Sequence, residues 1–426
     1  MLPNRMTHRL AATAAALLLA LTAQLHANEA LHWNRVACGA TEVALPLDPM
    51  AESRVLAIVH TAMHDAANAT HPRYHTYGAE QPQARGGSAE AAVATAAHVT
   101  LSALLPKQRA LFDHELTSSL QQVSDGEAKQ RGIAAGQTAA AWLLQARQQD
   151  GAQEVGEYAP RNEPGDYRPT PPDFTPAVAA GWGRVKPFVL TASAQFRPAP
   201  PPAVGSPRAL ADLEEVRLIG GEKSDRRTHE QSEIACFWYE NSTCGWNRIA
   251  ANVGAQQKLD LWDQARLLAL VNLAMADGFI GGFEAKYHYH YWRPATAIRE
   301  AGHAEWLSQL FTPPVPDYPS THTVLGGAVA ATMARFFGTD FVSFATTSGG
   351  PYPGITRRFW SFSQAARENG ASRVLAGIHF ASAVEAGYRQ GAEIGTWVFE
   401  RALQPLNRPA LTASTPHSAA ATAATN

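Results

Sequence analysis

The stretch PPVPDYPSTHT, residues 313–323, is a proline-rich approach that ends at Ser320 and leads into an apolar, glycine-bearing segment. This pattern predicts a helix over residues 319–337 with Ser320 as its N-cap. The amides of Thr321 and His322 then point out of the helix start, at the positive end of the helix dipole. A helix start with a hydroxyl and an imidazole beside it is suited to bind an anion. The alternative is an ordinary helix cap with an incidental histidine.

Upstream, the segment KYHYHYWRP, residues 286–294, places Lys286 and Arg293 seven residues apart. Seven residues are two helical turns, so we expect both cations on one helix face, with Tyr289 and His290 on the same stripe. Two neighbouring cations repel each other unless an anion lies between them. The alternative is a solvated basic face, which the flanking tyrosine and tryptophan residues disfavour because they indicate partial burial.

Downstream, the segment SRVLAGIHF, residues 372–380, places Arg373 and His379 six residues apart. This spacing puts them on different faces of a straight helix. They can meet at one ligand only if the chain bends, and Gly377 is the position where it can bend. Taken singly, this segment is a weak signal.

The three segments together resemble the signature of the type 2 phosphatidic acid phosphatase superfamily, which includes vanadium-dependent haloperoxidases and bacterial acid phosphatases. The matching patterns are Lys-x6-Arg-Pro, Pro-Ser-x-His and Ser-Arg-x5-His, in that order. Further stretches are similar to the haloperoxidase-like branch, among them LAIVH (56–60), DAANA (65–69) and WNRIA (246–250). The resemblance implies an all-α, helical-bundle fold.

The resemblance also implies a cage for a tetrahedral oxyanion. Arg293 and Arg373 would clamp its equatorial oxygens, as planar guanidinium groups do well. Lys286 would be a third, mobile donor, and Ser320 with the backbone amide at Thr321 would complete the cage.

Two histidines would carry the chemistry. His379 would be the axial ligand to vanadium in a peroxidase, or the nucleophile that forms phosphohistidine in a phosphatase. His322, on the opposite side, would be the acid–base group. In the peroxidase, Lys286 would polarise the bound peroxide, a halide would attack it, and hypohalous acid would result.

The sequence departs from the family pattern at two positions. The family usually has glycine where this chain has Thr321, whose side chain is expected to narrow the pocket. An aspartate commonly lies four residues after the last histidine, and here that position is Ala383, so another group must orient His379. Halide preference cannot be read, because Val315 and Phe283 stand where haloperoxidases carry residues that select the halide.

Chain length, the extra N-terminal helices and Trp292 favour a vanadate-dependent haloperoxidase. The alternatives are a soluble periplasmic acid phosphatase, which needs no cofactor, and a non-catalytic oxyanion-binding homologue. The expected partners are small molecules: hydrogen peroxide, halide and an organic acceptor, or a phosphate ester. The 35 Lys and Arg residues nearly balance 37 Asp and Glu residues, so no nucleic-acid partner is expected. The oligomeric state, including a homo-oligomer, stays open.

The N-terminus predicts export. Arg5 and Arg9 precede an apolar run at 10–21 and a small-residue exit, which is the pattern of a signal peptide cleaved after Ala27. We therefore expect a secreted or periplasmic protein. No later stretch reaches about 18 apolar residues, so the mature chain is expected to lack a membrane span.

We divide the chain into a signal peptide (1–27), an N-terminal helical part with a proline-rich excursion (28–225), a catalytic helical core (226–404) and a disordered tail (405–426). The excursion, residues 160–207, holds 12 of the 28 prolines, yet Phe174, Trp182 and Phe188 indicate that it packs over the helices. Helices are predicted over 49–69, from a capping box at 124–127 to about 148, and over 207–218, 260–283, 319–337 and 382–403.

Two further patterns involve metal- and sulfur-bearing side chains. Cys236 and Cys244 are close enough in sequence to form a disulfide, which leaves Cys38 unpaired. His60 and His64, four residues apart, have the spacing of a zinc helix, but no glutamate follows His60 and the segment is apolar. We therefore interpret both histidines as core residues.

Overall fold

The computed structural model describes residues 28–46, 48–154 and 156–407 of the chain. The predicted signal peptide and most of the predicted tail lie outside these residues. The described part is all-α apart from one small sheet. Its helices are α2 (Glu29–Ala44), α3 (Pro49–Thr70), α4 (Ala89–Leu104), α5 (Arg109–Gln121), α6 (Glu127–Ala146), α7 (Pro207–Ile219), α8 (His229–Phe237), α9 (Ser242–Gln256), α10 (Leu261–Tyr289), α11 (Pro294–Glu300), α12 (Thr321–Phe337), α13 (Phe362–Leu375) and α14 (Ala381–Arg401).

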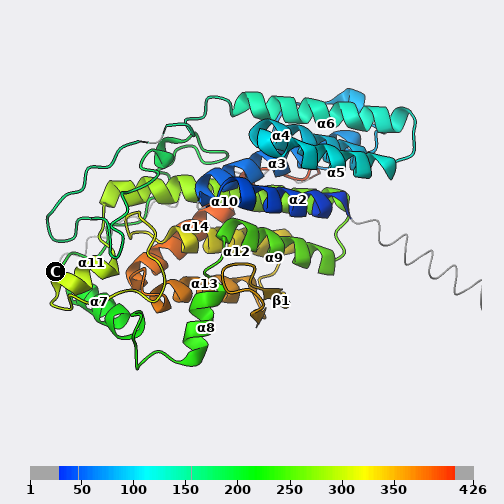
Figure 1. Cartoon of the computed structure of the whole chain (residues 1–426). Coiled ribbons are helices and arrows are strands. Elements are labelled where there is room, and N and C mark those ends of the chain that lie inside the picture. The colour runs from blue at the N-terminus through cyan, green and yellow to red at the C-terminus, as the bar shows by residue number, and fades with distance from the viewer. Residues whose placement is uncertain (1–27, 47, 155, 408–426) are drawn as a thin grey trace, which may run out of the picture.

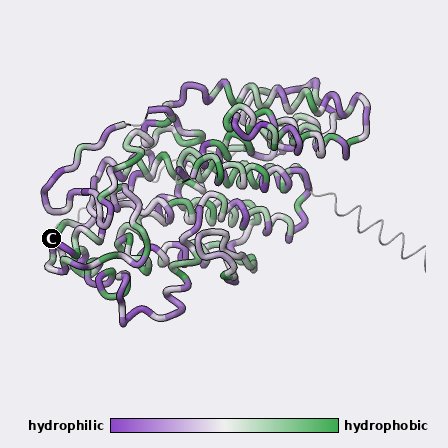
Figure 2. Tube along the Cα trace, in the orientation of Figure 1, coloured by the Kyte–Doolittle hydropathy of each residue, from purple (hydrophilic) through white to green (hydrophobic). Residues whose placement is uncertain are grey.

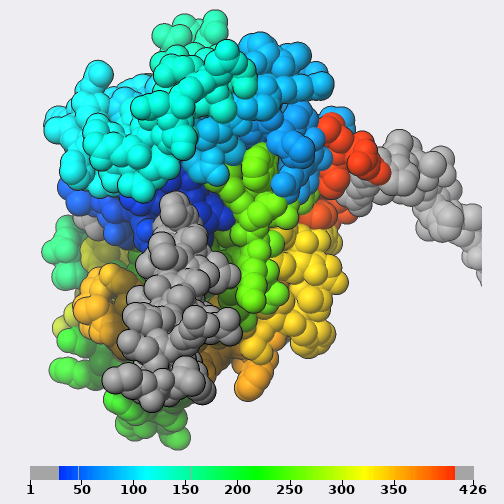
Figure 3. Space-filling view, turned by 90° about the vertical axis from the view of Figure 1, so that its right-hand side faces the viewer, coloured from blue at the N-terminus to red at the C-terminus, as the bar shows by residue number. Residues whose placement is uncertain are grey.

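The helices are arranged in layers around α10. Helices α3, α4, α5 and α6 form one layer, and α9, α12, α13 and α14 lie on the other side of α10 (Figure 1). The space-filling view shows the N-terminal helices stacked above the C-terminal ones (Figure 3). Hydrophobic residues are frequent along the central helices, and hydrophilic residues dominate the outer loops (Figure 2). The site segments are therefore anchored on the side of α10 opposite the N-terminal layer.

Helix α10 is long and apolar enough to cross a membrane, but 94% of its apolar window is buried inside the protein. Among the described helices, the pair formed by residues 89–104 and 106–121 is together also long and apolar enough, but it is bent by 120°. Burial is the ordinary reason for an apolar central helix in a large globular core. The composition of α10 is accounted for by packing.

Close packing between α12 and α14 depends on a stripe of glycines spaced four residues apart on α14. An added Cβ would lie 2.5 Å from the Ser320 carbonyl oxygen at Gly387, 2.0 Å from that of Val324 at Gly391, and 2.2 Å from that of Ala328 at Gly395. Residues at this spacing share one helix face. The stripe lets the two helix backbones touch, and it brings the start of α14 beside Ser320.

Most predicted helices are confirmed within two residues at each end, although α10 continues six residues beyond the predicted end. The predicted capping box at residues 124–127 is wrong. Gly126 is the N-cap of α6 and has φ 144, and Asp125 pairs with Lys129 instead. Glycine readily adopts this positive φ, which the backbone needs where it enters α6.

The proline-rich excursion is irregular apart from a short 3-10 helix, Trp182–Arg184, and it is ordered as predicted. Trp182 and Phe188 are buried, whereas Phe174 is 58% exposed. The expected anchoring by Phe174 is therefore wrong. The small sheet pairs β1 (Phe344–Thr347) with β2 (Thr356–Phe359) in antiparallel register.

His60 and His64 are core residues of α3. His60 is fully buried between the carbonyl oxygen of Leu56, 2.8 Å from Nδ1, and Oδ1 of Asn34, 2.9 Å from Nε2. His64 Nδ1 lies 3.1 Å from Asp65. No group of three metal-binding side chains occurs in the described ranges.

The stability of the protein is expected to fall in mild acid because of His60. Burial lowers the pKa of His60 to about 4, so only the unfolded chain takes up this proton as the pH falls from about 6.5 to about 4. The loss between pH 7.5 and 4.5 is about 2 to 3 kcal/mol. Urea unfolding at both pH values should show this extra dependence in the wild type and not in His60→Gln. Equal pH dependence of the two proteins would contradict it.

Candidate active site

Lys286 and Arg293 come from different elements. Helix α10 ends at Tyr289, and His290 follows in the left-handed region with φ 52. Arg293 is the extended N-cap of α11, directly before Pro294. The predicted single helix face is therefore wrong. A residue that precedes proline is excluded from helical geometry by the proline ring, and this turns the chain between the two cations.

The loop before Ser320 wraps around both cations. The ammonium of the fully buried Lys286 donates to the carbonyl oxygens of Pro316 at 2.6 Å and Asp317 at 3.0 Å. Arg293 Nε donates to the Val315 carbonyl at 2.7 Å. Its Nη1 donates to the Ile378 carbonyl at 2.6 Å. Lys286, expected to be a mobile donor, is thus held by the backbone of the proline-rich stretch.

The predicted helix start at Ser320 is confirmed, because Ser320 is the N-cap of α12. Its hydroxyl does not cap the helix but accepts a hydrogen bond from the Thr323 hydroxyl at 2.9 Å. The methyl group of Thr321 faces Gly282 of α10, where an added Cβ would lie 2.6 Å away. The missing side chain at position 282 therefore makes room for the extra side chain at position 321.

His322 lies in the first turn of α12, and its two ring nitrogens differ. Nδ1 contacts the hydroxyl of Ser242, at the start of α9. Nε2 is buried and has no hydrogen-bond partner in the part of the chain that the structure describes. Burial, and then the nearby Arg373 guanidinium, lower the pKa of His322 well below its usual value. The ring is therefore neutral, with one nitrogen available to a ligand. Sequence reasoning did not identify Ser242 as its partner.

The bend between Arg373 and His379 occurs where it was predicted. Helix α13 ends at Leu375, and Gly377 has φ +79. The amide of His379 then folds back to the Arg373 carbonyl oxygen at 3.3 Å. A Cβ at Gly377 would lie 2.0 Å from the Gly220 carbonyl oxygen. Both the backbone angle and the close contact therefore require glycine at this position.

Replacing Gly377 with alanine is expected to lower the free energy of unfolding by at least about 3 kcal/mol, because backbone strain and a backbone clash add. Gly338→Ala is the matched control. Gly338 has a similar φ of +71, but nothing lies within 4 Å of its added Cβ. This variant should lose only about 1 kcal/mol. Urea unfolding measures both, and equal losses would show that the Gly220 contact is unimportant.

Asp317 is a site residue that sequence reasoning missed. Its Oδ1 lies 2.9 Å from Nδ1 of His379 and 3.9 Å from Nη1 of Arg293. Burial raises the pKa of Asp317 to about 7, against the opposing effect of Arg293 and Lys286. The sequence signal that could have identified Asp317 is its position, three residues before the helix cap Ser320. Asp317 therefore supplies a carboxyl group beside His379, in place of the aspartate that the family commonly has at the position of Ala383.

Positive charge dominates the assembled site. Lys286, Arg293 and Arg373 are almost completely buried, and Asp317 is the carboxyl group among them. Burial, and then Arg293, lower the pKa of Lys286 well below its usual value. Burial, and then Arg293, Lys286, Arg373 and His322, lower the pKa of His379 well below its usual value. Unpaired buried charges are costly.

Arg373 supplies the buried donors that have no partner. Its Nε and Nη1 are enclosed, and no atom of the described residues accepts a hydrogen bond from them. Burial lowers the pKa of Arg373 to about 10, so its guanidinium stays charged at neutral pH. A buried cation with free planar donors matches the oxygens of a tetrahedral oxyanion.

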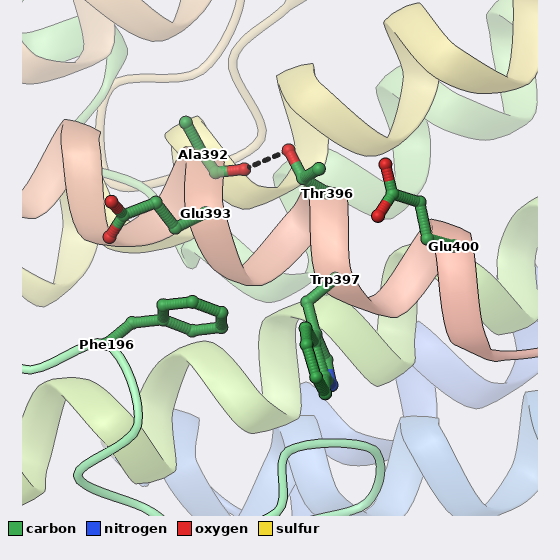
Figure 4. A pocket seen from close by; sticks show the side chains of 6 residues that line it. All are labelled: Phe196, Ala392, Glu393, Thr396, Trp397 and Glu400. Carbon is green, nitrogen blue, oxygen red and sulfur yellow. Dashed lines mark hydrogen bonds between the residues drawn. The ribbon is translucent and has the colours of Figure 1, made fainter. Parts of the chain in front are cut away.

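A surface groove elsewhere has the opposite chemistry. It has a volume of about 360 Å³ and lies between Phe196 and the outer face of α14. Glu393 and Glu400 flank Trp397 along this face (Figure 4). Two carboxylates disfavour an anion there. This groove is therefore a poor candidate for an anion site, and the buried cluster around Arg373 is the better one.

Comparisons with known proteins identify similar families and folds. Residues 266–408 match a family described as the VCPO second helical-bundle domain. The chain is 26% identical over 216 residues to a vanadium chloroperoxidase from Curvularia inaequalis, an alignment that covers 42% of this chain and 35% of the fungal protein. The match thus spans about a third of that relative's length.

Solved structures extend the likeness over most of the chain. A bacterial vanadium-dependent iodoperoxidase aligns with a TM-score of 0.79 and 25% identity, covering 89% of this chain and 98% of the other. A bacterial vanadium-dependent chloroperoxidase aligns with a TM-score of 0.70 and 18% identity. The alignment covers 84% of this chain and 93% of the chloroperoxidase chain. The second likeness shows the fold alone.

Proposed function

We propose that this chain is a member of the vanadium haloperoxidase-like family and that it is an exported, vanadate-dependent haloperoxidase that oxidises halide with hydrogen peroxide. The observation that carries the proposal is the buried guanidinium of Arg373. Its Nε and Nη1 have no hydrogen-bond acceptor among the described residues, and its charge is close enough to His379 to lower the pKa of that ring. Likeness to the iodoperoxidase over 89% of this chain supports peroxidase chemistry over other oxyanion chemistry.

The residues present fit vanadate, which is a tetrahedral oxyanion. Arg373 would bind its oxygens through Nε and Nη1, which have no other acceptor. His379 would hold vanadium through Nε2, because Oδ1 of Asp317 lies 2.9 Å from Nδ1 and favours the proton there. Nη1 of Arg293 lies 3.0 Å from Nε2, so this contact would have to give way to vanadium. When bound, vanadate supplies an electron-poor centre that activates hydrogen peroxide toward attack by halide.

Two side chains would manage charge and protons. His322 has its buried Nε2 free, and an anion beside it offsets the repulsion from Arg373, so its pKa rises when the site is filled. It can then hold a proton and deliver it from Nε2 to a departing oxygen. Lys286 is fixed by two carbonyl oxygens, and an anion in the site would favour its charged form, which burial and Arg293 disfavour.

Phosphate hydrolysis is the second candidate, and the neutral ring of His379 favours it. A neutral imidazole with its proton at Nδ1 has a lone pair at Nε2, which attack on phosphorus requires once Nη1 of Arg293, 3.0 Å from Nε2, moves to the bound oxyanion. The same geometry would also serve a non-catalytic oxyanion-binding protein.

Paired assays on purified protein test the proposal. The protein is loaded with orthovanadate, and bromide and iodide oxidation by hydrogen peroxide is measured beside hydrolysis of a phosphate ester. We expect halide oxidation that requires vanadate. Ester hydrolysis inhibited by vanadate, without halide oxidation, would establish the phosphatase. Vanadate binding without either activity would identify a binding protein. Export is tested separately, by N-terminal sequencing of secreted or periplasmic protein, which should begin at Asn28.

A further inference from the structure

Two cysteines far apart in sequence meet between the N-terminal helices and the site helices. Cys38 lies on α2, and Cys244 lies on the first turn of α9. The Sγ of Cys244 is 3.7 Å from the carbonyl oxygen of Cys38 and 4.0 Å from the hydroxyl of Thr41, one turn further along α2. The two thiols also contact each other side chain to side chain.

This arrangement differs from the pairing suggested by sequence. All three cysteines are free thiols, and Cys236 lies on α8 close to Arg227. Cys244 instead faces α2. Cys236 and Cys244 are near in sequence, but α8 and α9 are separate helices that direct the two side chains to different neighbours.

The surroundings of the pair suit thiol oxidation in two steps. Cys38 is partly exposed, so it is the residue of the pair that an oxidant in solution would meet first, whereas Cys244 is buried. Oε1 of the buried Glu52 lies 3.1 Å from the Cys244 Sγ and can accept its proton. The contact with the Cys38 thiol, followed by burial, raises the pKa of Cys244, so this thiol needs such an acceptor before it can react.

The pair is also linked to the active site. Asn241 caps α9 through hydrogen bonds from the amides of Thr243 and Cys244 to its Oδ1. Ser242, in the same turn, contacts Nδ1 of His322. The first turn of α9 orients His322 through Ser242. A covalent bond between Cys244 and Cys38 would therefore attach this turn to α2.

We propose that Cys38 and Cys244 are a redox pair that a peroxide oxidises to a disulfide, joining α2 to the first turn of α9. The Cys38 thiol gives up its proton, its sulfur attacks a peroxide oxygen, and the O–O bond breaks to give a sulfenic acid and one water. The sulfur of Cys244 then attacks that of Cys38, its proton leaves through Glu52, and the second water departs. Two thiols and hydrogen peroxide become one disulfide and two waters.

Peptide mapping tests the proposal on the full-length protein without vanadate or halide. Reduced protein is treated with hydrogen peroxide, free thiols are alkylated, and non-reduced peptides are identified by mass spectrometry. We expect a Cys38–Cys244 cross-link and an alkylated Cys236. A Cys236–Cys244 cross-link, or three alkylated thiols after peroxide treatment, would overturn the proposal. This result does not depend on whether the protein is a haloperoxidase.

Variants provide a second, independent measurement. The bond closes a loop of about 200 residues, so oxidation should raise the Tm by at least about 3 °C. Cys38→Ser should abolish both the cross-link and the rise in Tm. Cys236→Ser, the matched control, should retain both. A rise in Tm that persists in Cys38→Ser would show that another modification causes it.

Discussion

Replacing His379 with alanine is expected to reduce halide oxidation to background, and ester hydrolysis as well if the protein has that activity. His379 is the neutral imidazole among three buried cations, and both reactions would pass through its Nε2. Phosphate should still bind to the variant, because Arg373, Arg293 and Lys286 remain. Steady-state assays and calorimetric titration with phosphate measure the two effects on the same preparation.

This combination distinguishes loss of chemistry from loss of structure. If the variant binds phosphate as tightly as the wild type, the arrangement of Lys286, Arg293 and Arg373 is intact. Loss of phosphate binding together with activity would instead indicate a collapsed site, which thermal unfolding would reveal. Full turnover in His379→Ala would show that the reacting group has been misassigned.

Replacing Asp317 with asparagine is expected to lower vanadate affinity and halide oxidation about 10- to 100-fold, the usual effect of removing a carboxylate that orients a metal-binding histidine. The carboxyl oxygen of Asp317 lies 2.9 Å from Nδ1 of His379, and without it the tautomer that carries its proton on Nδ1 loses this support. Phosphate binding should respond differently. Removing a negative charge beside Lys286 and Arg293 raises the positive potential, so phosphate affinity should stay equal or increase.

Asp277→Asn is the control for this prediction. Asp277 is also fully buried, but it accepts hydrogen bonds from the backbone amides of residues 188–190. Its replacement should destabilise the protein and leave the ratio of vanadate to phosphate affinity unchanged. NMR of the histidine ring nitrogens should show a change of tautomer at His379 in Asp317→Asn alone. A parallel loss of vanadate and phosphate affinity in Asp317→Asn would contradict the positioning role.

Local sequence signals predicted the elements that local physics determines. Ser206 followed by Pro207 predicted the start of α7, and Ser320 predicted the start of α12, because caps act within one helical turn. The bend at Gly377 was predictable for the same reason. The single helix face for Lys286 and Arg293 was wrong because periodicity was extended up to Pro294, which excludes helical geometry at the preceding residue.

Contacts between distant segments could not be predicted in this way. Asp317 and His379 are 62 residues apart, and they meet only because the proline-rich loop wraps over the start of α14. Ser242 reaches His322, and Cys38 reaches Cys244, through the packing of α9 against α12 and α2. Sequence spacing therefore identified the residues of the cage, whereas their positioning partners required the fold.

Calorimetric titration of the purified protein with orthovanadate tests most directly whether this cluster is an oxyanion site. One vanadate per chain should bind, phosphate should compete for the same site, and Arg373→Ala should lose binding of both. Arg373 is the appropriate probe because its buried Nε and Nη1 have no protein partner. Absence of vanadate binding, or binding of the same strength in Arg373→Ala, would contradict the assignment of the site.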